Sequence, residues 1–222
     1  MTDILAIILR FIIHLFWYDS CMNFEILLAT NNKHKLEEVR QILSPHGIIV
    51  YCISDLNLDY KEPIEDGKTY KDNALIKADA LKELTDLPII ADDSGLEIEA
   101  LDNKLGLYSS RFASELGGYD NAFKYVLDKV KEKNNTKARF ICDIILVNIE
   151  DRPLLFEGIC EGNIASEVKG NDGFGYDPIF IPDGYDHSFA ELERNVKNSI
   201  SHRGRALKKL LTYLRLNGLI KK

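Results

Sequence analysis

The segment FEILLATNNKHKLEEVRQILS, residues 24–44, decides the class of fold to expect from this chain. Residues 24–30 form a short and almost continuous apolar run, which is typical of a buried strand. In residues 33–44 the apolar side chains recur at the spacing of one helix face. These positions are Leu36, Val39, Ile42 and Leu43. A buried strand that passes through a polar turn into an amphipathic helix favours an α/β fold.

The rest of the chain continues this alternation and then changes to paired strands. Further strands are expected at 47–53, 87–92, 138–149 and 154–165, and helices at 69–84, 120–133 and 203–218. The last two strands would form a hairpin across EDRP, residues 150–153. The buried stripe of the 69–84 helix is expected at Ala74, Leu75, Ala78, Leu81 and Leu84. We expect a mixed α/β sheet with flanking helices and a cleft between two lobes.

The composition limits the partners of the protein. The chain has 35 acidic and 28 basic residues, a net charge of −7. A broad nucleic-acid surface needs a basic footprint, so we expect no nucleic-acid partner. A small anionic ligand stays possible, because a metal ion can bridge acidic side chains to phosphate. The four cysteines form no CxxC pair, so we expect reduced thiols in a cytoplasmic protein and no zinc.

The first 21 residues stand apart from the rest. Residues 4–17 are apolar but shorter than the roughly 20 residues of a membrane span, and an arginine and a histidine interrupt them. Met22 then precedes the first strand. We expect residues 1–21 to be an extension outside the fold and 22–222 to be a single domain. The alternative is that the extension is an amphipathic membrane anchor.

The turn LLATNNKHK, residues 27–35, is the first candidate binding element. Its polar residues lie where the amino terminus of a helix exposes unpaired N–H groups, which bind anions. Lys35 could reach a phosphate from the first turn. The alternative is that Thr30 or Asn32 only caps the helix.

The segment ADDSGLEIEAL, residues 91–101, is a candidate metal site. Asp92 and Asp93 follow an apolar strand directly, and ligand groups gather at strand ends in α/β folds. Neighbouring carboxylates repel each other unless a cation is present, which suggests Mg²⁺. The alternative is a solvated turn. Three acidic residues before the 69–84 helix could supply another ligand: Glu62, Glu65 and Asp66.

Two later segments could bind a planar, oxygen-rich ligand. In GNDGFGYDPIF, residues 170–180, glycines flank Phe174, whose ring could stack on a base, while Asp177 could accept from ring N–H groups. The alternative is a buried Phe174 in a glycine-rich turn. In NVKNSISHRGRAL, residues 195–207, cationic side chains lie just before the last helix. Positive charge is unfavourable at the amino terminus of a helix, which favours a role in ligand binding over a purely structural one. These residues are Lys197, His202 and Arg203.

In this order, TNNKHK, ADDSGL, GNDGFGYDPIF and SISHRGRAL resemble the motifs of the inosine triphosphate pyrophosphatase family. The resemblance covers about residues 24–216. It implies hydrolysis of deaminated purine nucleoside triphosphates (ITP, dITP and XTP) to the monophosphate and pyrophosphate. It also implies Mg²⁺ as cofactor, a homodimer, and an elongated, twisted, mixed sheet with two lobes around a central nucleotide-binding cleft.

The resemblance also implies roles for individual residues. The phosphate-binding residues would be Thr30, Asn32, Lys35 and Lys77. Asp93, or Asp92 beside it, would be the general base. Asp93 and Glu65 would hold the metal, although Glu62 and Asp66 remain close rivals of Glu65. The other substrate-binding residues would be Ser94 beside Asp93, the loop residues Phe174, Gly175, Tyr176 and Asp177, of which Phe174 would stack on the base, and Lys197, His202 and Arg203, which would recognise the base. His202 and Arg203 would donate to a 6-oxo group, which adenine lacks.

Two other functions stay open at this point. One is the hydrolysis of other abnormal nucleotides, such as methylated pyrimidine triphosphates, although the SHR segment favours an oxo-purine. The other is a nucleotide-binding sensor without turnover, against which the intact set of carboxylates and lysines argues.

Overall fold

The computed structural model describes residues 23–221, and the expectations for residues 1–21 lie outside this range. The strands are β1 (Phe24–Leu28), β2 (Ile48–Cys52), β3 (Ile89–Ile98), β4 (Lys137–Val147), β5 (Leu154–Ile164) and β6 (Phe180–Pro182). The helices are α2 (Lys33–Leu43), α3 (Tyr70–Lys82), α4 (Ser109–Glu115), α5 (Tyr119–Lys133), α6 (Arg194–Ile200) and α7 (His202–Leu216). Short 3₁₀ helices are η1 (Ser44–His46), η2 (Ile53–Leu56), η3 (Glu99–Leu101), η4 (Gly106–Tyr108) and η5 (Asp177–Ile179). Within the described range, no helix has the length and apolar character needed to cross a membrane.

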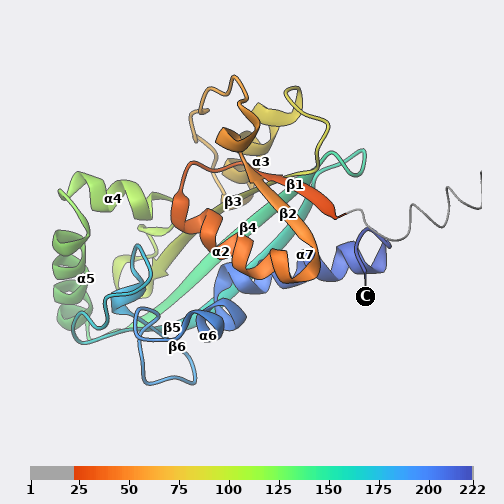
Figure 1. Cartoon of the computed structure of the whole chain (residues 1–222). Helices are drawn as coiled ribbons and strands as arrows, with labels where there is room; N and C mark the ends of the chain where they lie inside the picture. The colour runs from red at the N-terminus through yellow and green to blue at the C-terminus, as the bar shows by residue number, and fades with distance from the viewer. Residues whose placement is uncertain (1–22, 222) are drawn as a thin grey trace, which may run out of the picture.

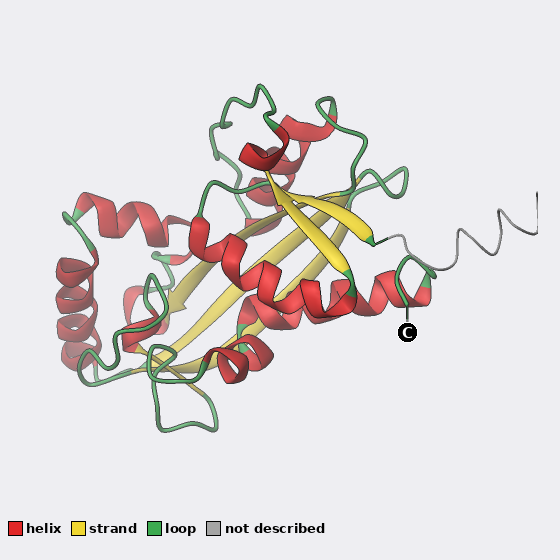
Figure 2. Ribbon diagram, in the orientation of Figure 1, coloured by secondary structure: helices red, strands yellow, loops and turns green. Residues whose placement is uncertain are grey.

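The strands form one mixed sheet, in the order β2-β1-β3-β4-β5-β6. β1 is parallel to both β2 and β3, and from β3 to β6 each strand is antiparallel to its neighbour. Figure 2 shows this sheet with helices packed around it. The expected α/β fold with a mixed sheet is therefore confirmed, as is the β4–β5 hairpin.

Helices cover both faces of the sheet, and the alternation of the strands decides what each face receives. Apolar side chains of α2 and α7 pack on one face, where they meet Ile90 and Ile144. α3 packs on the opposite face, against Ile89 and Ile145. Successive residues of a strand point to opposite faces. Asp92 therefore points towards α2 and α7, and Asp93 points towards α3.

The expected end of the third strand at residue 92 is wrong. β4 offers antiparallel partners along the whole of β3, from Ile89 to Ile98, so the polar ADDSG segment stays in the sheet. On its other side β3 pairs with β1 only up to Ile90, because β1 ends at Leu28. Asp92 and Asp93 thus lie inside β3, just beyond the point where its neighbour β1 ends.

The helices differ from the expectation in three respects: α4 and α6 were not expected, Leu75 in the stripe of α3 is only half-buried, and α3 is shorter than predicted. α3 ends at Lys82, so Leu84 lies beyond the helix and is 40% exposed instead of completing the buried stripe. In α7 the expected apolar face is confirmed, since its leucines are buried against the sheet: Leu207, Leu210, Leu211 and Leu214.

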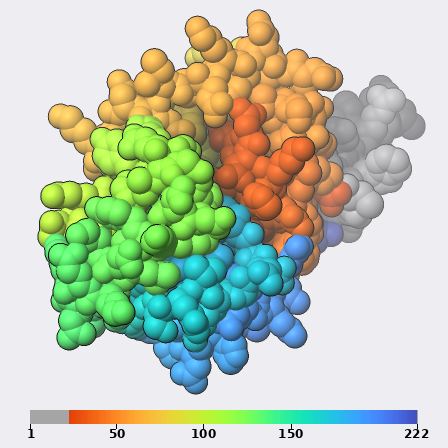
Figure 3. Space-filling model, turned by 90° about the vertical axis from the view of Figure 1, so that its left-hand side faces the viewer, coloured from red at the N-terminus to blue at the C-terminus, as the bar shows by residue number. Residues whose placement is uncertain are grey.

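The far end of the sheet carries a separate apolar cluster under α4 and α5. Its members include Leu96 on β3, Phe140 on β4 and Phe180 on β6. In Figure 3, segments from the N-terminal third, from α4 and α5, and from the loop before β6 meet on one face of the molecule. These segments surround the candidate site.

Candidate active site

A cavity of about 490 Å³ opens between the β1–α2 turn, the loop before α3, β3, α4, the 170–177 loop and the start of α7. Every residue expected in the site contributes to its wall. These residues are Thr30, Asn32, Lys35, Glu65, Lys77, Asp93, Ser94, Phe174, Gly175, Tyr176, Asp177, Lys197, His202 and Arg203. The fold brings them together from seven separate parts of the chain, while the role of each residue stays a prediction.

The β1–α2 turn is held by its own polar side chains. Asn32 Oδ1 accepts hydrogen bonds from the backbone N–H groups of His34 and Lys35, at 2.9 and 3.2 Å. Thr30 Oγ1 accepts from the backbone of Asn32 at 3.1 Å. Helix capping, the alternative to phosphate binding, is thus present in the structure. The cap fixes the turn with the positive end of the α2 dipole facing the cavity.

A buried ion-pair network lies behind this turn and joins three segments of the chain. Arg203 Nε and Nη2 donate to Asp92 Oδ2 at 3.1 and 2.8 Å, and Arg203 Nη1 donates to Glu38 Oε2 at 2.6 Å. Lys35 Nζ lies 3.2 Å from the same Asp92 oxygen. Burial alone would raise the pKa of Asp92, but the charges of Lys35 and Arg203 hold it well below its usual range. Asp92 therefore stays ionised and locked, and it does not reach the cavity wall.

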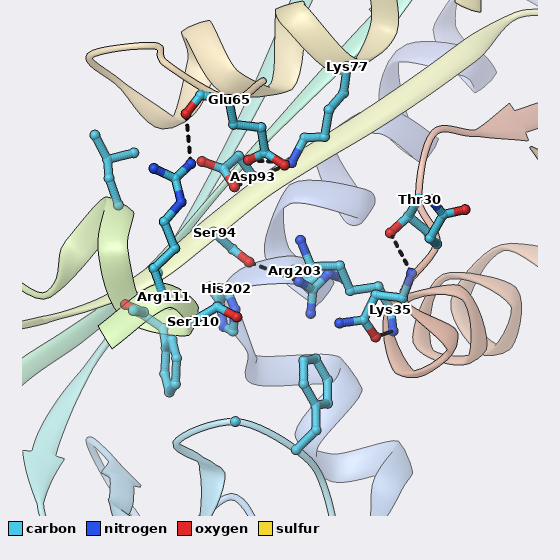
Figure 4. A pocket seen from close by; sticks show the side chains of 18 of the residues that line it. Thr30, Lys35, Glu65, Lys77, Asp93, Ser94, Ser110, Arg111, His202 and Arg203 are labelled. Carbon is cyan, nitrogen blue, oxygen red and sulfur yellow. Dashed lines mark hydrogen bonds and ion pairs between the residues drawn. The ribbon is translucent and has the colours of Figure 1, made fainter. Parts of the chain in front are cut away.

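Asp93, on the other face of β3, belongs to a second charged group (Figure 4). Lys77 Nζ lies 3.4 Å from Asp93 Oδ1 and 3.4 Å from Glu65 Oε2. Asn73 Nδ2 donates to Asp93 Oδ2 at 3.1 Å. Burial raises the pKa of Asp93, although the charges of Lys77 and Lys35 act in the opposite direction. A further cation beside Asp93 would therefore stabilise its ionised carboxylate.

The oxygen ligands of the group formed by Glu65, Lys77 and Asp93 suit a hard divalent cation. Glu65 and Asp93 converge on one ammonium group, whereas Glu62 accepts from Asn31 Nδ2 at 3.3 Å. Between residues 23 and 221 no group of three or more His, Cys, Asp or Glu side chains could hold a metal by itself. Proteins commonly bind Mg²⁺ through only one or two carboxylates, and the oxygens of substrate phosphates complete its coordination. The residues present thus fit Mg²⁺ together with a polyphosphate.

The 170–177 loop presents Phe174 to the cavity, beside Lys197 and Arg203. Asp177 Oδ2 accepts from the Phe174 backbone N–H at 2.8 Å and from Lys197 Nζ at 2.7 Å. Gly173 has a φ of +80°, and a Cβ there would collide with the Asp177 carboxylate. One oxygen of Asp177 is thus used to hold the loop, and a ligand could reach only the other one.

Phe174 itself is half-buried, so the alternative of a buried core ring is wrong. Lys197 Nζ and Arg203 Cζ lie 5.1 and 5.7 Å from its ring centroid. Tyr176, two residues later, is buried and donates its hydroxyl to the Ser109 carbonyl at 3.0 Å. The loop is therefore anchored on both sides while one aromatic ring faces the cavity.

His202 begins α7 and lies flat on Phe140, with ring centroids 4.6 Å apart. A Cβ at Gly158 on β5 would collide with the His202 carbonyl, so glycine lets the start of α7 approach the sheet. Burial, helped by the charges of Arg203 and Lys197, lowers the pKa of His202 well below its usual value. His202 Nδ1 has no hydrogen-bond partner among the described residues. A neutral imidazole with an unpaired nitrogen thus lies in the cavity wall.

Several residues of the site were not expected from the sequence. Asn73 lies four residues before Lys77 on α3, and this helical spacing could have indicated it. Glu38 lies three residues after Lys35 on α2, in the same relation. Arg111 on α4 donates to the Glu65 carbonyl at 2.7 Å, and nothing in its local sequence pointed to the cavity.

Comparison with known proteins gives consistent matches over this part of the chain. A dITP/XTP pyrophosphatase of Dictyoglomus thermophilum is 43% identical over 192 residues, which are 85% of this chain and 93% of that protein. A dITP/XTP pyrophosphatase of Desulforamulus reducens is 44% identical over 86% of this chain and 95% of its own length. Both matches extend over nearly the whole length of the relative.

Solved structures give the same result. The Ham1 protein of Staphylococcus aureus superposes with a TM-score of 0.76 at 34% identity, over 87% of this chain and 99% of that one. A HAM1 protein from Coxiella burnetii gives a TM-score of 0.74 at 38% identity, over 86% and 98% of the two chains. The model of the Ham1 family matches residues 26–213, which include every residue of the cavity wall. The chain belongs to the Ham1 family.

Proposed function

We propose that this protein hydrolyses deaminated purine nucleoside triphosphates, ITP, dITP and XTP, to the nucleoside monophosphate and pyrophosphate. One observation carries the proposal: the wall of a single cavity contains both an aromatic ring with a neutral histidine, Phe174 and His202, and the Glu65–Lys77–Asp93 group. The first set suits a purine base, and the second suits a polyphosphate with a cation. The relatives named dITP/XTP pyrophosphatase support this choice of substrate.

The base would stack on Phe174 and place its 6-oxo group near His202 and Arg203. Arg203 has five N–H donors. Four of them are taken: Nε–H and one Nη2–H by Asp92, the other Nη2–H by Ser94 and one Nη1–H by Glu38. One Nη1–H is left for a ligand acceptor. Adenine presents an amino group at this position, and a site built to donate there can reject it by about 10⁴-fold.

The reaction would be attack of water on the α-phosphorus. Asp93 would accept the proton from the water, because its carboxylate lines the cavity and burial raises its pKa. Lys77 would neutralise charge on the phosphates, and Lys35 with the start of α2 would stabilise the departing pyrophosphate. Asn73 would hold Asp93 in place through its hydrogen bond.

We propose Mg²⁺ as the cofactor, held by Glu65 and Asp93 together with phosphate oxygens of the substrate. When bound, Mg²⁺ would supply charge neutralisation on the phosphates and polarise the attacking water. The convergence of both carboxylates on Lys77 supports this assignment over Glu62, which faces Asn31, and over Asp66, which is outside the cavity wall.

We further propose that residues 22–222 act as one domain, that the protein is a cytoplasmic homodimer, and that it binds no nucleic acid. The free cysteines Cys52, Cys142 and Cys160 fit a reducing compartment. Sedimentation of the purified protein tests the dimer: a single species at monomer mass would contradict it.

The function is tested by incubating the purified protein with ITP, XTP, ATP, GTP and a methylated pyrimidine triphosphate, with and without Mg²⁺. Pyrophosphate and orthophosphate are assayed separately. We expect Mg²⁺-dependent pyrophosphate from ITP and XTP, with the other nucleotides nearly untouched. Orthophosphate release would contradict the proposed bond, and equal rates on ATP would contradict the proposed base pocket.

A further inference from the structure

All but one of the lysine and arginine side chains in the cavity wall are paired with a carboxylate. Five lysine and arginine side chains line it: Lys35, Lys77, Arg111, Lys197 and Arg203. Four of them lie within 4.0 Å of a carboxylate oxygen. Over residues 23–221, Arg111 is the one cation of this wall without such a partner. Its guanidinium is exposed and forms no ion pair with a carboxylate among the described residues.

Arg111 is nevertheless held in a defined direction. It is the third residue of α4, and its Nη2 donates to the Glu65 carbonyl at 2.7 Å. Its Cζ lies 5.6 Å from the centroid of the Tyr108 ring. Figure 4 shows the side chain reaching from α4 to the loop that carries Glu65. A neutral carbonyl takes one N–H and leaves the charge and the other donors of the guanidinium available.

The hydrogen bond to Glu65 places Arg111 beside the residues that we propose bind the polyphosphate. The carboxylate of Glu65, the same residue, lies 3.4 Å from Lys77 Nζ, which in turn lies 3.4 Å from Asp93. A planar guanidinium binds phosphate oxygens through paired hydrogen bonds. We infer that Arg111 binds the triphosphate of the substrate, which would supply the anionic partner that Arg111 lacks among the described residues. This inference rests on the proposed function.

The test compares Arg111→Gln and Arg111→Lys with the matched control Arg152→Gln, on an exposed arginine outside the cavity wall. Glutamine keeps an N–H donor for the Glu65 carbonyl but has no charge, so it separates phosphate binding from the tether to the loop. Two quantities are measured: kcat/KM for pyrophosphate release from ITP, and the Kd of inorganic tripolyphosphate with Mg²⁺ by calorimetry. Tripolyphosphate has no base, and its binding requires no turnover.

We expect Arg111→Gln to lower kcat/KM and to raise the Kd of tripolyphosphate, each by about 10- to 100-fold. Arg111→Lys should recover part of both losses, and Arg152→Gln should change neither by more than about twofold. An unchanged Kd in Arg111→Gln would overturn the inference, even if kcat/KM fell, because Arg111 would then only position the loop. Absence of pyrophosphate release by the unaltered protein would instead refute the proposed function, while the calorimetric comparison would still decide on Arg111.

Discussion

The rings of His34 and Phe174 lie nearly parallel, with centroids 5.3 Å apart and an interplanar angle of 11°. His34 belongs to the first turn of α2, and Phe174 to the glycine-rich loop before β6. The stack thus joins the turn expected to bind phosphate to the loop expected to bind the base. Phe174 lines the cavity and His34 does not, so His34 supports the ring without filling the cavity.

Removal of this support should weaken substrate binding more than catalysis. An aromatic pair contributes about 0.5–1.5 kcal/mol beyond its buried area. We expect His34→Ala to raise KM for ITP by about 2- to 10-fold with kcat nearly unchanged, and His34→Phe to keep KM close to normal. His187→Ala, at an exposed histidine outside the cavity wall, is the control. Equal losses in His34→Ala and His34→Phe would show that stacking is not the cause.

The role of Asp93 can be separated from its place in the sheet by a neighbouring aspartate. Asp143 is its antiparallel partner on β4 and is also buried, but it is outside the cavity wall. We expect Asp93→Asn to lower kcat by at least about 10³-fold with the thermal midpoint nearly unchanged. Asp143→Asn should leave kcat within a few-fold of normal. Near-normal turnover of Asp93→Asn would exclude it as base and as essential metal ligand.

The sequence predicted β1 to β5 and the helices α2, α3, α5 and α7, because their apolar patterns are local, but it did not predict β6, α4 or α6. The full set of expected site residues came from the resemblance of the motifs to a known family. The apolar run and helical spacing of residues 24–44 predict β1 and α2 without knowledge of their neighbours. The end of β3 could not be read in this way. ADDSG is polar and rich in turn residues, and only the long pairing with β4 keeps it extended.

The same reason explains which contacts were missed. In a strand that extends through residue 98, the alternation of side chains places Asp92 and Asp93 on opposite faces, with separate roles. A strand that ends at residue 92 does not predict this separation. The bonds of Arg203 to Glu38 and of Arg111 to Glu65 join residues 165 and 46 positions apart. Such contacts depend on how the lobes pack, which no short pattern encodes.

The choice of metal ligand can be decided by titration with Mg²⁺. Glu65 lies 3.4 Å from Lys77 Nζ beside Asp93, while Glu62 lines the same cavity but faces Asn31. We expect Glu65→Gln to raise the Mg²⁺ concentration for half-maximal ITP hydrolysis by about tenfold or more, the effect of losing one charged ligand. Glu62→Gln, the matched control, should change it by less than about twofold. The opposite ranking would assign the ligand to Glu62.

The proposed domain boundary is tested by expressing the chain from Met22. The sheet and all three apolar clusters lie within the described residues, which begin at Asn23. We expect the shortened protein to unfold at the same temperature as the full chain and to hydrolyse ITP at the same rate. Loss of folding or of activity would show that residues 1–21 belong to the working structure.

The buried pair of Asp92 and Arg203 should make the stability of the protein depend on pH in a defined direction. The pKa of Asp92 lies well below its usual range in the folded protein. A carboxyl whose pKa is lowered by folding stabilises the folded protein fully at any pH above its unfolded pKa, about 3.9. This stabilisation is lost as the pH falls from that value towards the lower pKa of the folded protein. The ion pair therefore contributes its full stabilisation at neutral pH and less in acid.

Asp92→Asn removes this contribution and leaves Arg203, with 2% of its surface exposed, paired only with Glu38 among its carboxylate partners. Breaking a buried pair in this way costs about 3–5 kcal/mol, which we expect as the loss in free energy of unfolding at pH 7. In urea titrations the difference between the two proteins should shrink below about pH 4, where the unfolded carboxyl becomes protonated. The control Asp79→Asn, on the exposed side of α3, should show no difference at either pH. A difference that grew on acidification would mean that Asp92 is held protonated in the folded protein and that the network around Arg203 has another charge pattern.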